Sequence, residues 1–309
     1  MSQSWDPQHP VDRKLATDLI GTQFPDVDLT SLTYEGCGWD NFVWRCGDIV
    51  FRFPHQTEAM QLIEHEWRVL PHVAGLLDMP VPEPLFRSNP TTEYPFVFVG
   101  YRWIPGQLPI GLHLTTEERC RAAAPLARFA RALHNIPVAQ AVGWGAPNNL
   151  ERGDMGIRLE YATVRAGQLS DTPHAALAGK AVEAMTPPPP EIAETQLRFT
   201  HGDVHASQML FNAQHNVVGM IDWGNVGIGD PAYDLQIAHS FIPPEGRARF
   251  WEVYGPVGEG PRARARFIAL SYGLAILVNA LETDNGPLRT ETLFSLQNAL
   301  SPTQPTPSI

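Results

Sequence analysis

Two aspartates, Asp203 and Asp222, and the amide of Gln208 are the residues of this sequence best suited to chemistry. They belong to one stretch, HGDVHASQMLFNAQHNVVGMIDWGNVGIGDPAYD, which runs from His201 to Asp234. A carboxylate on a loop, an amide oxygen five residues later and a second carboxylate at a strand end can hold Mg²⁺ and orient a hydroxyl group. The chemistry that needs such a set is phosphoryl transfer.

A β-hairpin is expected to position these residues. Two apolar segments, QMLFN and VVGMID, flank the polar loop Ala213–Asn216, which is the pattern of two strands and a turn. If Asn212 pairs with Val217, the antiparallel register places Gln208 opposite Ile221. The segment that follows Asp203 then lies beside Asp222, although the two acids are nineteen residues apart in the sequence.

This stretch resembles the aminoglycoside phosphotransferase family, which comprises small-molecule kinases with a protein-kinase-like fold. The family pattern is roughly H-G-D-x-x-x-x-N, a strand, I-D-[WLF] and G-D-P-x-x-D. The residues that match it are His201, Gly202, Asp203, Ile221, Asp222, Trp223, Gly229, Asp230, Pro231 and Asp234.

The resemblance implies that Asp203 is the catalytic base, that Asp222 binds the metal, and that His201 and Asp234 support the catalytic loop. One position departs from the family, because Gln208 stands where the family has Asn. Gln carries the same amide oxygen on a longer stem, and Mg²⁺ demands near-ideal octahedral geometry. We therefore expect a second metal site that is shifted, weakened or bridged by water.

A cation and a carboxylate in the first third of the chain are expected to form an ion pair. Arg52 lies on a predicted strand after the hairpin turn Gly47-Asp48, and Glu66 lies beside the apolar stripe of a helix predicted over 58–74. A buried carboxylate needs a partner, and Arg52 can supply it. In a kinase fold, such a pair reaches the α- and β-phosphates of the nucleotide. A purely structural pair is the alternative.

The other expected nucleotide contacts come from a turn and from a hinge. Gly38 and Asn41 lie in a glycine-containing turn where a kinase covers the phosphates, although a plain β-turn explains this pattern equally well. Arg102, Trp103 and Ile104 follow an apolar strand. By the family resemblance, their backbone groups hold the adenine.

The expected fold is α+β and bilobal, like that of a protein kinase. Residues 1–104 form a nucleotide-binding lobe with an antiparallel sheet, and residues 105–309 form a mainly helical lobe with the catalytic loop and the acceptor pocket. A helix is expected to begin after Thr115, because T-T-E-E is an N-terminal capping signature. Asp230, Glu282 and Asp284 are acids available to a cationic acceptor.

Composition limits the partners and the compartment. The net charge of −11 disfavours nucleic acid and anionic membranes. Three cysteines without metal spacing fit a reducing cytoplasm. The N-terminal segment lacks the apolar core of a signal peptide, and no run of about 18 apolar residues predicts a membrane span.

Together these features predict a cytoplasmic, Mg²⁺-dependent kinase, monomeric or homodimeric, that uses ATP or GTP. It moves the γ-phosphate to a hydroxyl of an aminoglycoside-, macrolide- or amino-alcohol-like small molecule. A degenerate nucleotide- or ligand-binding protein is the main alternative, because Gln208 and Arg52 depart from common kinase residues. A metallohydrolase that uses His201, Asp203, His205 and Asp222 as ligands, and a protein kinase, are two further alternatives.

Overall fold

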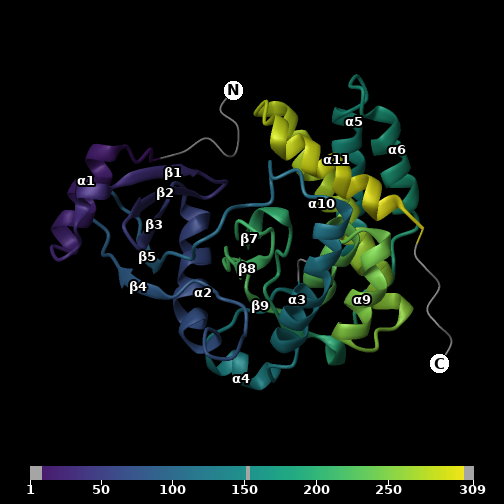
Figure 1. Cartoon of the computed structure of the whole chain (residues 1–309), viewed down its shortest axis with the longest axis horizontal. Coiled ribbons are helices and arrows are strands. Elements are labelled where there is room, and N and C mark those ends of the chain that lie inside the picture. Colours follow the sequence, from purple (N-terminus) through teal and green to yellow (C-terminus); the bar gives the residue numbers. More distant parts are fainter. Residues whose placement is uncertain (1–8, 151–153, 303–309) are drawn as a thin grey trace. The chain divides into compact units, whose positions relative to one another are not determined.

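The computed structural model describes residues 9–150 and 154–302. These residues divide into two compact units (Figure 1). Unit 1 comprises the described residues up to Leu76 together with Pro80–Ile104 and Asp222–Asn225. Unit 2 comprises Leu77–Met79, Pro105–Ile221 and the described residues from Val226 onward. Asp222 thus belongs to unit 1, whereas Asp203 and Gln208 belong to unit 2.

Unit 1 is built on a five-stranded antiparallel sheet with the strand order β1-β2-β3-β5-β4. Its strands are β1 (Thr33–Cys37), β2 (Asn41–Cys46), β3 (Ile49–Pro54), β4 (Pro84–Arg87) and β5 (Val99–Arg102). Its helices are α1 (Arg13–Gln23), the short 3₁₀ helix η1 (Leu29–Ser31) and α2 (Thr57–Val73). The predicted hairpin is confirmed: β2 and β3 flank Gly47-Asp48, and Gly47 has a φ of 57°.

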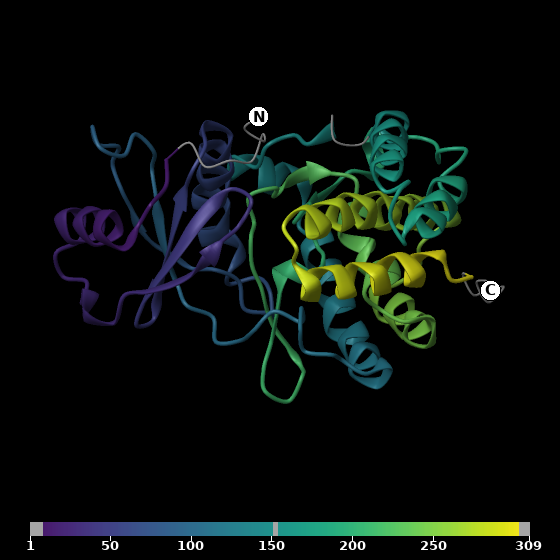
Figure 2. The same ribbon diagram turned by 90° about the horizontal axis from the view of Figure 1, so that it is seen from above.

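Strand β3 sends alternate side chains to opposite faces of the sheet, as its pleat requires. Phe51 and Phe53 are fully buried in a core that also contains Leu19 and Ile20 of α1. Arg52 points the other way, toward Glu66 of α2. The two helices therefore cover opposite faces of the sheet (Figure 2).

Unit 2 is mainly helical. Its helices are α3 (Thr116–His134), α4 (Val138–Gly143), α5 (Met155–Gln168), α6 (Ala175–Ala184), α7 (Ala232–Leu235), α8 (Ile237–Ser240), α9 (Pro244–Tyr254), α10 (Glu259–Glu282) and α11 (Gly286–Leu300). Two 3₁₀ helices are η3 (Glu194–Gln196) and η4 (Ala206–Gln208). Two small antiparallel sheets pair β6 (Arg198–Thr200) with β9 (Gly227–Gly229) and β7 (Met209–Phe211) with β8 (Val217–Met220). The predicted α+β class, an antiparallel sheet followed by a mainly helical part, is confirmed.

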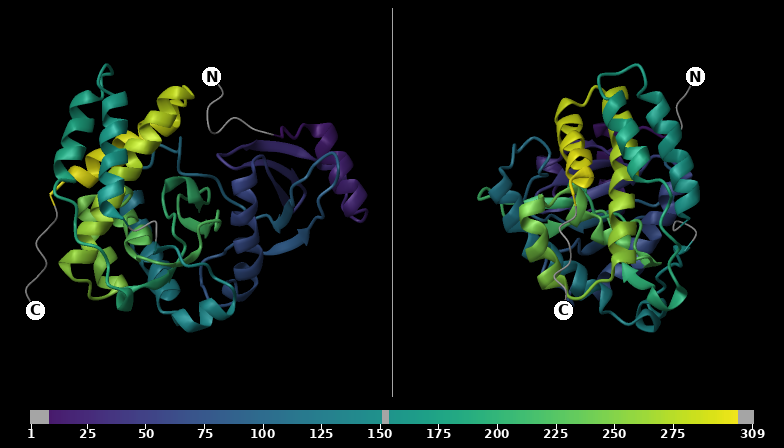
Figure 3. Two further views of the ribbon diagram at one scale, coloured as in Figure 1. Left: turned by 180° about the vertical axis from the view of Figure 1, so that it is seen from behind. Right: turned by 90° about the vertical axis from the view of Figure 1, so that its right-hand side faces the viewer.

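The longest helix, α10, forms the centre of unit 2. It packs against α5, α7, α8 and α11, and α5 and α6 stand side by side as an adjoining pair (Figure 3). Gly273 lets α10 approach α11, because a Cβ atom there would lie 2.6 Å from a methyl group of Leu296. By length and composition α10 could cross a membrane, but 56% of its apolar window is buried within the protein. That burial is typical of a core helix.

Candidate active site

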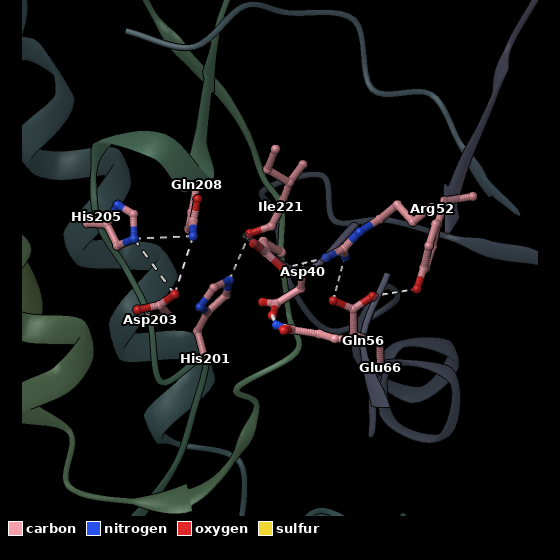
Figure 4. A network of polar contacts seen from close by, with 11 residues as sticks. Asp40, Arg52, Gln56, Glu66, His201, Asp203, His205, Gln208 and Ile221 are labelled. Atoms are coloured by element: carbon pink, nitrogen blue, oxygen red, sulfur yellow. Dashed lines mark hydrogen bonds and ion pairs between the residues drawn. The ribbon is translucent and has the colours of Figure 1, made fainter. Parts of the chain in front are cut away.

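In unit 1, Arg52 joins two carboxylates. Its Nη1 donates to Glu66 Oε1 at 2.7 Å (Figure 4). Its Nη2 donates to Asp222 Oδ1 at 2.7 Å. The ion pair expected between Arg52 and Glu66 is therefore present. Tyr101 of β5 donates its hydroxyl hydrogen to the second oxygen of Glu66. The guanidinium is thus held in one orientation by partners on α2 and on the segment that follows β8.

Burial and charge shift the pKa values of this cluster in defined directions. Burial alone would lower the pKa of Arg52, but Glu66 and Asp222 outweigh it and raise that pKa well above its ordinary value. Burial raises the pKa of Glu66, and Arg52 opposes the shift. Burial also raises the pKa of Asp40, to which the negative charge of Asp222 adds. Arg52 thus interacts electrostatically with three carboxylates, those of Glu66, Asp222 and Asp40, which leaves an excess of negative charge around it.

The turn between β1 and β2 contains the predicted phosphate contacts. The Gly38 N–H donates to the Asn41 carbonyl at 2.9 Å, so this N–H is used within the turn. Asn41 is buried, and its side-chain oxygen has no hydrogen-bond partner among the described residues. The Gly38 N–H is therefore not free in this conformation, which leaves the Asn41 amide as the candidate of this turn for ligand contact.

Two of the three residues expected at the adenine, Arg102 and Trp103, already bond to other groups of unit 1. The Arg102 N–H donates to the Glu83 carbonyl at 2.9 Å, and the Trp103 N–H donates to the Asp48 carbonyl at 2.7 Å. The Arg102 side chain is exposed and pairs with Glu83, and Arg45 covers the Trp103 ring. The N–H groups of Arg102 and Trp103 are therefore used within unit 1, and the expectation that backbone groups of this segment hold the adenine stays a prediction. Of the three N–H groups, that of Ile104 remains as the candidate donor to the adenine.

In unit 2, Asp234 holds the backbone of the loop that precedes Asp203. This fully buried carboxylate accepts from the His201 N–H at 2.9 Å and from the Gly202 N–H at 2.8 Å. His134 of α3 lies 3.0 Å from the same carboxylate. Gly202 has a φ of 83°, which a residue with a side chain adopts only under strain. The supporting position expected for Asp234 thus agrees with the contacts that the structure shows.

Asp203 emerges from this anchored turn, half-buried. Gln208 directs its amide Nε2 at Asp203 Oδ2, 3.3 Å away, and His205 Nε2 lies 3.7 Å from the same oxygen (Figure 4). Because the amide nitrogen faces Asp203, the atom of Gln208 that could ligate a metal is Oε1. The three side chains form one polar group on the loop and on η4.

The predicted hairpin is confirmed near the site and differs at its turn. Met209 pairs with Met220, and the Ile221 N–H donates to the Gln208 carbonyl at 2.8 Å, as the expected register requires. Val217, however, pairs with Phe211 rather than with Asn212, because a bulge interrupts the ladder there. The reason is local: the Asn212 side chain accepts from the Gln214 and Asn216 N–H groups and draws Asn212 into the turn.

The structure does not support two of the expected roles, a metallohydrolase ligand set on the loop and a contact from Asp230 to a cationic acceptor. Within residues 9–150 and 154–302, no group of three or more His, Cys, Asp or Glu side chains could share a metal ion. The His201 ring instead contacts the Ile221 carbonyl through Nε2 at 3.0 Å. Asp230 is not available to a cationic acceptor, because it is buried and pairs with Arg264 at 2.6 Å.

Some residues of the site leave no signal in the sequence. Tyr101, which holds Glu66, lies 35 residues away from it, and Asp40 is joined to the Arg52 cluster only by the fold. Gln236 of the α7–α8 junction donates its Nε2 hydrogen to the Val204 carbonyl, directly after Asp203. The sequence around each of these three residues gives no indication of the contact that it makes.

Comparisons with known proteins identify a family and a shared fold. Residues 36–268 match the model of the phosphotransferase enzyme family, whereas a search of curated proteins finds no match. Several solved structures share the fold. The GDP complex of aminoglycoside 2'-phosphotransferase-IIIa has 22% identity and a TM-score of 0.69, with 94% of this chain and 99% of that chain covered.

Two more solved structures extend the comparison. The GDP and kanamycin complex of APH(2")-IIia has 22% identity and a TM-score of 0.65 over 92% of this chain and 97% of that one. Macrolide 2'-phosphotransferase MphH from Brachybacterium faecium has 20% identity and a TM-score of 0.62 over 94% and 99%.

Proposed function

We propose, on the premise that this chain belongs to the phosphotransferase enzyme family, that it moves the γ-phosphate of ATP or GTP to a hydroxyl of a small molecule. The observation that carries the proposal is the presentation of Asp203. A loop anchored by the buried carboxylate of Asp234 presents a second, partly exposed carboxylate, that of Asp203, which Gln208 and His205 contact. Such a group can accept a hydrogen bond from an alcohol and align it for in-line attack.

The remaining residues take roles that follow from their chemistry. Arg52, held by Glu66, would contact the α- and β-phosphates with its planar donors. Asp222, with Gln208 Oε1 as second ligand, would hold Mg²⁺, which neutralises the phosphate charge when bound. The Asn41 amide and the Ile104 N–H would complete the contacts to the nucleotide. The excess of carboxylates around Arg52 supports a cation at Asp222.

The solved relatives guide the choice of donor and acceptor. They include a GDP complex and a complex with GDP and kanamycin, so both ATP and GTP are donors to be tested. Aminoglycosides, macrolides and amino alcohols are the first acceptor classes to be tested. A nucleotide donor and three free cysteines favour the cytoplasm.

A transfer assay tests this proposal. The protein is incubated with Mg²⁺ and ATP or GTP and an acceptor panel, and phosphorylated products are detected by mass spectrometry and ³¹P NMR. Asp203→Asn should reduce the rate by about 10²- to 10⁴-fold, the usual contribution of a positioned base. Asp171→Asn, an exposed acid of the same unit, serves as the matched control. Transfer that survives Asp203→Asn would contradict the assigned role.

The alternative, binding without catalysis, has one observation in its favour. The Gln208 amide nitrogen contacts Asp203, the residue proposed as base, at 3.3 Å. If that contact persists with a substrate bound, it competes with the alcohol for the carboxylate. A protein that binds nucleotide with Mg²⁺ but phosphorylates no acceptor class, even as Gln208→Asn, would support this alternative.

A further inference from the structure

A pocket in unit 2 adjoins the catalytic loop. The space between its walls, open solvent at the mouth included, is ≈ 400 Å³. His205 and Ser207 of the loop form one wall, and residues of the α7–α8 segment, α10 and α11 form the others. The α10 and α11 helices lie side by side in that wall (Figure 2).

Two buried polar atoms in this wall lack a hydrogen-bond partner. Gln236 and Ser240 line the pocket and are 0% and 7% exposed. Within the described part of the chain, neither Gln236 Oε1 nor Ser240 Oγ has a partner. The Gln236 Nε2 donates to the Val204 carbonyl, so the oxygen is the amide atom of Gln236 that is left without a partner. A buried polar atom without a partner costs about 1–3 kcal/mol, which a ligand hydroxyl can recover.

The charge of the pocket argues against a cationic ligand. Glu291 is the single carboxylate among its lining residues, all of which belong to the described chain. Arg119 neutralises it through two hydrogen bonds of 2.7 and 2.6 Å, and both side chains are buried. Glu282 and Asp284 are exposed and lie outside the lining. An ammonium group would therefore lose its hydration without gaining a free counter-charge.

The other residues that line the pocket are partly apolar and partly polar. Phe241, Ile276 and Leu288 supply apolar surface, and the Tyr272 ring meets the His205 ring edge to face. Hydroxyls of Thr292 and Ser295 stand among them. An apolar patch beside a few fixed hydroxyl and amide oxygens suits a molecule with one hydroxylated side and one apolar side.

We propose that this pocket binds an uncharged, polyhydroxylated alcohol with an apolar face, such as a neutral glycoside, and that Gln236 Oε1 and Ser240 Oγ bind its hydroxyl groups. If the proposed function holds, this molecule is the phosphate acceptor. The binding itself does not depend on that function. The structure thus favours neutral acceptors over the polycationic and amino-alcohol classes.

Matched ligands test the proposal. Binding of n-butyl β-D-glucopyranoside is compared by calorimetry, without nucleotide, with binding of its 2-amino-2-deoxy analogue, which is an ammonium ion at neutral pH, and of kanamycin. The neutral glycoside should bind at least about tenfold more tightly than its ammonium analogue, a difference of about 1.4 kcal/mol. Absence of binding by the neutral glycoside, or tighter binding of either cation, would overturn the proposal.

Two variants locate the binding in this pocket. Ser240→Ala should weaken binding of the neutral glycoside about three- to tenfold, the worth of one hydrogen bond, without lowering the melting temperature. Ser170→Ala, an exposed serine outside the pocket, is its control. Ser295→Asp places an unpaired carboxylate in the half-buried wall and should raise affinity for the ammonium analogue. Unchanged affinities in both pocket variants would place the ligand elsewhere and end the proposal.

Transfer assays separate this inference from the proposed function. The neutral glycoside bound in the pocket but never phosphorylated with Mg²⁺ and ATP or GTP would uphold the pocket assignment and count against the function. Phosphorylation confined to cationic acceptors would uphold the function and overturn the pocket assignment.

Discussion

Arg52 forms ion pairs with two carboxylates of unit 1. The Arg52 side chain is 17% exposed, and its guanidinium pairs with Glu66, whose side chain is 1% exposed, and with Asp222. The pairing with Glu66 can be predicted, because a carboxylate on the buried side of a predicted helix requires a cation and β3 supplies one. Three features cannot be predicted, because only the folded chain defines them. They are the hydrogen bond from Tyr101, the electrostatic effect on Asp40, and the buried Gln236 Oε1 and Ser240 Oγ atoms without a partner.

Removal of Arg52 should destabilise the protein strongly. Arg52→Ala leaves Glu66 buried without its counter-ion, and breaking a buried ion pair in this way costs about 3–5 kcal/mol. Urea unfolding of the variant should show a loss of this size in the free energy of unfolding. Arg52→Met combined with Glu66→Leu should lose less than Arg52→Ala, because no buried charge is then left alone.

The control for this prediction is the exposed pair of Lys14 and Asp18, at 2.7 Å, in which the lysine side chain is 85% exposed. Lys14→Ala should leave the free energy of unfolding almost unchanged, because a solvent-exposed ion pair contributes little to stability. If Lys14→Ala and Arg52→Ala lowered the free energy of unfolding equally, burial of the Arg52 pair would not contribute to stability.

At the scale of elements, local sequence signals succeed where a few neighbouring residues decide the structure. The capping signature at Thr115 predicts the start of α3, and Thr115 and Glu118 form the expected reciprocal capping box. Neighbouring residues likewise decide the β2–β3 turn and most of the β7–β8 register, and both could be predicted. The bulge at Phe211 could not be predicted from strand alternation, since the Asn212 side chain competes with the ladder.

The capping box makes the stability of the protein depend on pH. Hydrogen bonds from Thr115 and His215 lower the pKa of Glu118 from 4.5 to about 2. A lowered folded-state pKa stabilises the protein above the unfolded pKa, and this stabilisation is lost as the pH falls from 4.5 toward 2. The stability difference between wild type and Glu118→Gln should therefore be constant above about pH 5.5 and shrink below 4.5. A difference that grows as the pH falls would refute this assignment.

The loop that carries Asp203 should depend on Asp234. Asp234→Ala orphans the buried N–H groups of His201 and Gly202 and removes the partner of His134, so the free energy of unfolding should fall by at least about 3 kcal/mol. Asp234→Asn keeps one acceptor oxygen and should lose less. Urea unfolding measures both, and amide hydrogen exchange at Gly202 should accelerate. A loss below about 1 kcal/mol in Asp234→Ala would show that the loop is held by other contacts.

For the whole molecule, the division into two units is the main feature. Each unit buries its own apolar residues, among them Phe51 and Phe53 in unit 1 and Leu274 and Leu277 in unit 2. A separate core is what allows a domain to unfold by itself. We expect two transitions in differential scanning calorimetry rather than one.

Core variants assign those transitions. Phe51→Ala should lower only the transition of unit 1, because it removes about 3–5 kcal/mol of stability from that core. Leu274→Ala should lower only the transition of unit 2, by about 2–5 kcal/mol. A single transition that both variants shift together would mean that the two units unfold as one.

The central claim is a nucleotide site that needs a metal ion held by Asp222. Calorimetric titration of ATP and of GTP, with and without Mg²⁺, into wild type and Asp222→Ala tests it most directly. We predict binding that strengthens with Mg²⁺ in wild type and loses that dependence in Asp222→Ala. Nucleotide binding that is absent, or indifferent both to Mg²⁺ and to Asp222, would contradict the account.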